Sequence, residues 1–130
     1  MRQLTIVSIG LALFTTIAGA APSSPLVCAI VDVFDCSGKE CVEVTSEAVG
    51  VPDLVRVDDT EKSMTALDAE FEGRTTKLDS MTKEGGKTTA RAHDGDRSLV
   101  LAVEGESGDA ILTVSDNKVV LVGYGECSQR

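Results

Sequence analysis

The stretch LVCAIVDVFDCSGKEC, residues 26–41, decides the fold of this chain. Residues 27–35 are rich in β-branched side chains, which favour an extended strand, and the polar, glycine-containing residues 37–40 have the chemistry of a tight turn. Residues 41–45 then alternate valine with polar side chains, so we expect a β-hairpin. Cys36 and Cys41 flank its turn, where a disulfide can pin the hairpin and contribute about 2 kcal/mol.

The fourth cysteine lies near the other end of the chain. If Cys36 pairs with Cys41, then Cys28 is left to pair with Cys127, closing a loop of about 100 residues for up to about 5 kcal/mol. The first and last strands of a closed barrel are neighbours, so this bond fits barrel closure. Four cysteines allow three connectivities, and this one is inferred from their spacing. A zinc site needs two close pairs of ligands, and the isolated fourth cysteine disfavours it.

Extended segments continue along the rest of the chain. They are expected at residues 54–58, 62–68, 74–82, 97–104, 109–115 and 118–126. No segment of ten or more residues has a helical period, and only residues 46–52 suit a single helical turn. The predicted fold class is all-β, a small antiparallel meander barrel or sandwich of about eight strands, closed by disulfides. Short connections favour the up-and-down barrel.

The first twenty residues have the pattern of a signal peptide. Arg2 precedes an apolar run, and Ala18-Gly19-Ala20 is a small-residue cleavage site. Cleavage after Ala20 leaves residues 21–130 as a single β domain without a membrane span. We therefore expect a periplasmic or secreted protein in an oxidising compartment, where disulfides persist.

Charge and composition restrict the partners. The chain has 21 acidic and 12 basic residues, a formal net charge of −9, three Phe, one Tyr and no Trp. Nucleic acids and anionic membrane surfaces are disfavoured as partners, because binding them needs clustered cations and, for bases, exposed rings. Acidity explains solubility, and it also permits a basic protein partner.

Candidate chemical residues are few. The single histidine, His93, lies in a His-Asp-Gly-Asp stretch that is typical of a turn. A Ser-His-Asp site with Ser98 can be drawn, but the sequence has no nucleophile elbow or oxyanion loop. No catalytic residue, metal ligand or cofactor site is therefore predicted.

Asp32 is the most unusual carboxylate in the sequence. Strand alternation places it on the same face as Cys28, which we expect to be buried. A buried aspartate must be hydrogen-bonded, paired or functional, and Arg56 or Arg74 could be its partner. Asp32 and Arg56 are accordingly the binding candidates.

Two glycines in the last strand share the face of Cys127. Because the side-chain period of a strand is two residues, Gly123 and Gly125 point in the same direction as Cys127. Glycine permits close approach of the backbone, so the pair indicates either barrel curvature or a gap where a ligand enters.

Several segments together resemble a known group of proteins. The strand around Cys28, the Cys36-x4-Cys41 hairpin, the segment VPDLVRVD at residues 51–58 and the closing YGEC at residues 124–127 carry the likeness. They resemble a family of small exported bacterial proteins of unknown function, with a Cys-rich hairpin near the start and an aromatic-Gly-x-Cys at the end. The resemblance implies a shared β fold and assigns no catalytic or binding residue.

Three functional classes follow from these patterns. The first is an exported, non-enzymatic envelope or secreted protein that binds a small apolar ligand. The second is an inhibitor of a basic enzyme such as lysozyme, by analogy with small disulfide-closed periplasmic barrels. The third, an enzyme, lacks a nucleophile–base pair. A lined cavity of about 300 Å³ would favour the first class, and a filled interior would count against it.

Overall fold

The computed structural model describes residues 25–71 and 73–129, and the predicted signal peptide at residues 1–20 lies outside them. Within this part of the chain, nine strands form one antiparallel sheet, with almost no helix. The strands are β1 (Leu26–Asp35), β2 (Val42–Val44), β3 (Leu54–Asp58), β4 (Ser63–Ala66), β5 (Thr75–Glu84), β6 (Lys87–Asp94), β7 (Arg97–Glu104), β8 (Asp109–Ser115) and β9 (Val120–Gln129). The helical pieces are α1 (Ser46–Val49) and the short 3-10 turn η1 (Ala69–Phe71).

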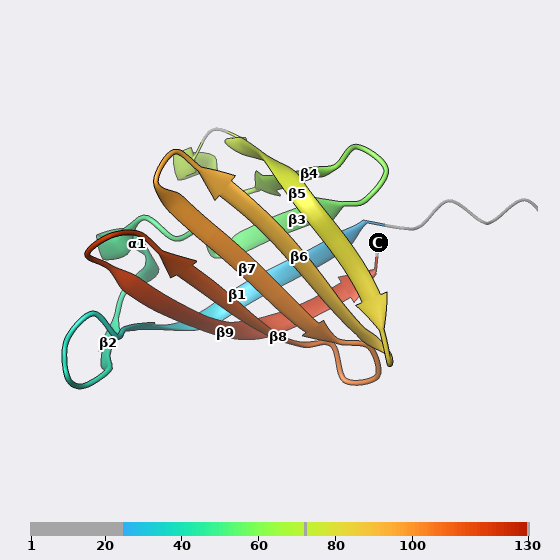
Figure 1. Ribbon diagram of the computed structural model, residues 1–130. Coiled ribbons are helices and arrows are strands. Elements are labelled where there is room, and N and C mark those ends of the chain that lie inside the picture. The colour runs from blue at the N-terminus through green and yellow to red at the C-terminus, as the bar shows by residue number, and fades with distance from the viewer. Residues whose placement is uncertain (1–24, 72, 130) are drawn as a thin grey trace, which may run out of the picture.

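The sheet closes into a barrel. From β3 to β9 each strand pairs with the next along the chain, and β1 pairs with β3 on one side and with β9 on the other (Figure 1). Among the described residues, eight strands thus complete the barrel, and β2 is an additional short strand beside the end of β1. The predicted all-β, disulfide-closed meander is confirmed, and of its two forms, barrel and sandwich, the structure has the barrel that the short connections favoured.

Both predicted disulfides are present. Cys28 and Cys127 lie directly opposite each other in the β1–β9 register and are bonded. Cys36 and Cys41 are bonded across the turn that joins β1 to β2. One bond therefore closes the barrel, whereas the other pins a hairpin that extends from its rim (Figure 1).

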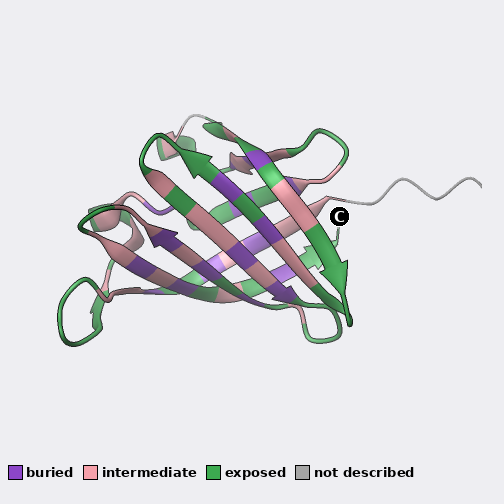
Figure 2. Ribbon diagram, in the orientation of Figure 1, coloured by how far each residue is buried: buried purple, intermediate pink, exposed green. Residues whose placement is uncertain are grey.

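The barrel interior is filled with aliphatic side chains. Buried and exposed residues alternate along the strands, as Figure 2 shows in bands, because neighbouring side chains point to opposite faces of a sheet. The largest fully buried side chains are Leu101, Leu121 and Val57. No charged or polar side chain is buried in the part of the chain that the structure describes. The aromatic-poor sequence therefore builds its core mainly from Val, Leu, Ile and Ala.

Strand β6 was not among the predicted segments. Its inward residues are Ala90 and Ala92, both buried, and they alternate with the exposed, polar Arg91 and His93. Alanine is only weakly hydrophobic, so the alternation of buried and exposed residues in β6 is not visible in the hydropathy of the sequence. The prediction that His93 lies in a turn is wrong, because β6 continues to Asp94 before the chain turns.

Candidate binding site at the barrel end

A pocket opens at one end of the barrel, and it is small. Its volume is about 30 Å³, far below the roughly 300 Å³ of typical small-molecule sites. A hollow of about 530 Å³ around Leu54 and Leu67 is larger, but it lies on the outer wall and is open to solvent. The structure therefore gives no support to a ligand enclosed within the barrel, and a ligand at the end pocket would insert only one of its groups.

The walls of the pocket are apolar and come from strands distant in sequence. They consist of Val55 from β3, Met64 and Ala66 from β4, Leu99 from β7, and Leu112 and Val114 from β8. Gly50, Val51, Pro52, Thr76, Arg74 and Arg97 complete the lining. Only the last three of these side chains bring polar groups to an otherwise apolar surface.

The segment after α1 covers this end of the barrel. Thr45 caps the helix, since its Oγ1 accepts a hydrogen bond from the N–H of Ala48 at 3.3 Å. Gly50 ends it in the left-handed conformation, with φ of 70°, which glycine adopts without steric cost. The reversal directs Val51 into the barrel end, where only 4% of it is exposed. Residues 50–53 are called the end plug below.

Two carboxylates hold the end plug in place. Asp68 accepts hydrogen bonds from the backbone N–H groups of Asp53 and Leu54, both at 2.8 Å. The side-chain carboxylate of Asp53 in turn accepts a 2.5 Å hydrogen bond from the hydroxyl of Ser46. The backbone carbonyl of Asp53 accepts one from the N–H of Ile30 at 2.8 Å. The plug is thus tied to β1 and to the connection after β4.

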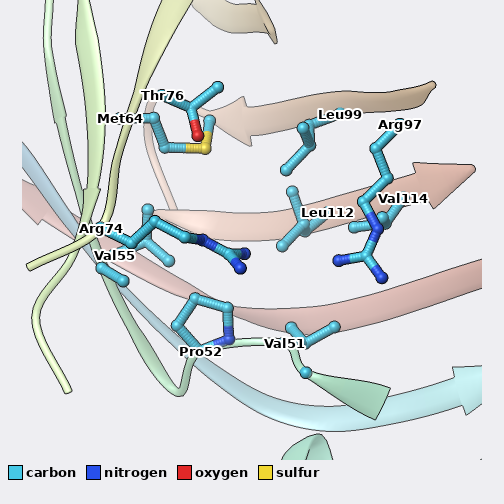
Figure 3. A pocket seen from close by; sticks show the side chains of 12 residues that line it. Val51, Pro52, Val55, Met64, Arg74, Thr76, Arg97, Leu99, Leu112 and Val114 are labelled. Atoms are coloured by element: carbon cyan, nitrogen blue, oxygen red, sulfur yellow. The ribbon is translucent and has the colours of Figure 1, made fainter. Parts of the chain in front are cut away.

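Two arginines converge on the mouth of the pocket. Arg74 immediately precedes β5, and Arg97 is the first residue of β7. Figure 3 shows their side chains reaching from opposite sides toward the space between them. Within residues 25–71 and 73–129, no carboxylate lies within ion-pair distance of either guanidinium. The mouth therefore combines an apolar wall with two converging positive charges.

Each arginine has a neighbouring side chain, Phe71 beside Arg74 and Asp116 near Arg97. The Arg74 guanidinium lies 5.6 Å from the centroid of the Phe71 ring, a cation–π distance. Asp116 lies on the Arg97 side of the pocket. The backbone N–H groups of Lys118 and Val119, which donate to this carboxylate at 2.8 Å, hold the pKa of Asp116 below its usual value, and Arg97 adds a longer-range contribution. The Asp116 carboxylate is therefore engaged mainly with its own turn.

The structure does not support the predicted pairing of Asp32 with an arginine. A β-bulge between Ile30 and Asp32 adds one residue to β1, so that Val31 and Asp32 are both exposed and Val33 returns to the core. The expectation that Asp32 is buried is therefore wrong. Arg56 is exposed on the outside of β3, opposite Val27, and no ion pair or hydrogen bond joins it to Asp32 among the described residues.

The glycines of β9 serve close packing. A β-carbon on Gly125 would overlap the backbone carbonyl of Ala29, and one on Gly123 would lie 2.9 Å from the side chain of Ile30. Both glycines face the β1 side of the interior, where the two strands approach closely. The predicted alternative of a glycine-lined gap for a ligand is therefore not supported.

His93 has neighbours that resemble a catalytic set without completing one. Its Nδ1 lies 2.6 Å from an Asp79 carboxylate oxygen across the β5–β6 pair, and Ser98 is its register partner on β7. This hydrogen bond, followed by the charge of Asp79, raises the pKa of His93. Both side chains of the pair are largely exposed, and no hydrogen bond joins Ser98 to His93 in the described chain. A nucleophile needs such an activating bond.

Comparison with known protein families, curated proteins and solved structures finds no match for this chain. Across residues 25–71 and 73–129, no helix is long and apolar enough to cross a membrane. The same residues bring together no group of three His, Cys, Asp or Glu side chains suited to a metal ion.

The end pocket is distinguished by apolar walls and two convergent cations, Arg74 and Arg97. Neither arginine was predicted as a site residue. Arg74 and Arg97 are 23 residues apart, and no local sequence signal relates them.

Proposed function

We propose that this protein is an exported, non-enzymatic β-barrel protein that binds the apolar end of a small ligand at the pocket beneath the end plug. The observation that carries this proposal is an apolar pocket at a barrel mouth, lined by few convergent polar groups, which is the usual composition of a small-molecule site. Because the cavity is only about 30 Å³, the rest of the ligand stays outside the barrel.

Export is a separate part of the proposal. Two disulfides are compatible with an oxidising compartment, the periplasm or the surrounding medium. The signal-peptide pattern of residues 1–20 supports the same location, and so does the resemblance to small exported bacterial proteins, which stays a prediction. Fractionation of cells that express the full chain, with mass measurement of the product, tests both export and cleavage after Ala20.

The ligand is tested by purification of the exported protein from its native compartment and mass spectrometry of whatever small molecules remain bound. Ala66 lines the pocket and is buried, so Ala66→Leu fills the space that the ligand needs. Ala102 lies on the outer face of β7, and Ala102→Leu provides a matched control. We expect a bound molecule with the wild type and the control, and its loss with Ala66→Leu. Retention of the same molecule by folded Ala66→Leu would contradict the proposal.

A second candidate function is inhibition of a basic enzyme. It is favoured by the excess of acidic residues, 21 against 12 basic, and by the exposure of every charged side chain to at least some degree in the described chain. Such a surface would steer a positively charged partner and would lose this attraction at high salt. Titration of the protein into a lysozyme assay tests the idea, and unchanged activity at micromolar concentration would exclude it.

A further inference from the structure

We infer that the ligand of the end pocket is a short, branched apolar carboxylate, with its apolar group among the pocket walls and its carboxylate between Arg74 and Arg97. This inference rests on the proposed ligand-binding function and specifies its chemical class. It follows from three features of the site: its charge, the geometry of its polar groups and its size.

The charge of the site is opposite to that of the protein. The chain as a whole carries a net charge of −9, yet the mouth of this pocket presents two guanidiniums with no carboxylate in ion-pair contact among the described residues. Apolar walls such as Leu99 and Val114 reduce the screening of charge beside them. A bound anion at the mouth would be attracted by both guanidiniums, whereas a neutral or cationic ligand would not.

The polar groups favour a carboxylate. A guanidinium is planar and offers paired N–H donors that match the two oxygens of a carboxylate. Arg97 is partly buried at the start of a barrel strand, and Arg74 lies against the ring of Phe71. Arg74 is exposed, whereas the partly buried Arg97 loses less side-chain freedom on binding, and both side chains reach toward the mouth (Figure 3).

The size of the pocket limits the apolar group. A volume of about 30 Å³ accommodates roughly two water-sized groups. Its walls are methyl and methylene groups from residues such as Met64 and Leu112, so this space suits the end of a branched chain of a few carbons. A long acyl chain would need a hollow interior, and the core of this barrel is filled.

The test uses three small probes in NMR titrations of the isotope-labelled mature protein. Isovalerate carries both the branched chain and the carboxylate, isovaleramide replaces the carboxylate with a neutral amide, and acetate has the carboxylate without the branched chain. We expect isovalerate to shift the amide signals of Val51, Leu112 and Arg97. Its dissociation constant should be about tenfold lower than that of isovaleramide, because a charge-assisted pair is stronger than a neutral one. It should also be about tenfold lower than that of acetate, which buries no branched chain in the pocket.

Variants assign the charge to named residues. Arg74→Gln and Arg97→Gln should each weaken isovalerate binding about tenfold and leave isovaleramide unchanged. Arg56→Gln is the matched control, since Arg56 is exposed on the outer wall and does not line the pocket. Equal weakening by Arg56→Gln would indicate a general effect of net charge and would overturn the assignment.

The outcomes separate this inference from the proposed function. If isovaleramide shifts the same amide signals and binds as tightly as isovalerate, the inference that the ligand carries a carboxylate is wrong, and the proposed apolar ligand site stands. If acetate binds as tightly as isovalerate, the mouth holds anions without an apolar group. If none of the probes shifts these amides at millimolar concentration, the inference fails, while molecules retained on native purification decide the proposed function independently.

Discussion

The seam between β1 and β9 and the wall formed by β4 and β5 are held together in different ways. At the seam the two strands pair along their whole length, from Leu26 opposite Gln129 to Asp35 opposite Leu121, and a disulfide joins them. The β4–β5 wall has a shorter ladder: residues 63–65 of β4 are in register with β5, and one further backbone hydrogen bond lies at each end, from Ala66 to Arg74 and from Leu78 to Lys62. Joining the two ends of the chain loses the most conformational entropy, so the strongest contacts lie where closure is most costly.

Part of the end pocket lies on the less extensively paired side, and the rest is lined by β3, β7, β8 and the end plug. Met64 and Ala66 of β4, Thr76 of β5 and Arg74 just before it all contribute to its lining. Binding surfaces are commonly drawn from the less stable parts of a fold, because a site must admit its ligand. The barrel therefore contrasts a seam closed by a disulfide and a long ladder with a wall joined by a shorter ladder.

The largest expected effect is on the seam disulfide. Replacing its cysteines with alanine, Cys28→Ala with Cys127→Ala, should lower the free energy of unfolding by about 4 to 5 kcal/mol, since the bond closes a loop of 99 residues. The hairpin pair, Cys36→Ala with Cys41→Ala, should cost about 2 kcal/mol because it closes only five. Urea denaturation of the oxidised proteins measures both, and equal losses would contradict the special role of the seam.

Close packing at the seam is tested next. Gly125→Ala places a β-carbon against the backbone carbonyl of Ala29, which cannot move without disturbing the β1–β9 ladder. We expect a loss of about 2 to 3 kcal/mol in urea denaturation. Gly38→Ala is the control, because a β-carbon there meets no atom within 4 Å. It should change stability by less than about 0.5 kcal/mol.

Hydrogen exchange compares the two regions without mutation. Amides in the middle of β4 should open with a free energy about 2 kcal/mol lower than those in the middle of β9, because the β4–β5 ladder is short. Native-state exchange followed by NMR gives both values residue by residue. Equal protection of Thr65 and Val122 would show that the barrel opens only as a whole.

The smallest effect concerns the outer wall. The Asp79 hydrogen bond raises the pKa of His93 above its ordinary value of 6.5. The contribution of this pair to the stability of the folded state is therefore fully present below pH 6.5. It is lost as the pH rises through the folded-state pKa. Asp79→Asn should return the His93 pKa toward 6.5, measured by NMR titration of the ring. An unchanged pKa would show that the pair does not persist in solution.

Much of the architecture follows from local sequence. Residues 26–41 predicted a strand and a disulfide-pinned turn, and residues 54–58 match β3. Which residues of the last strand face inward was also predictable from alternation: Leu121 is 2% exposed and Tyr124 is 46% exposed. These features depend on side-chain alternation and turn chemistry, which act over a few residues.

Other features depend on neighbours that local sequence does not contain. Nothing in residues 26–35 marks the bulge that turns Asp32 outward, because the extra residue is set by register with β9. Strand β6 has only alanines to bury at its centre, and its place in the sheet is decided by β5 and β7 on either side. The failure to predict β6 and the wrong prediction that Asp32 is buried both arise because neighbouring strands decide these features.

The four cysteines, the alternating valines and the turn residues determined an all-β meander closed by disulfides, a barrel or a sandwich, because strand alternation and loop closure are properties of the chain itself. The candidate site was decided only by the tertiary structure. Arg74 and Arg97 share a pocket mouth because β5 and β7 both run antiparallel to β6, so that they start at the same end of the sheet, and the curvature of the barrel brings them beside the end plug. Convergence of side chains across a closed sheet depends on register and curvature, which are collective properties of all the strands.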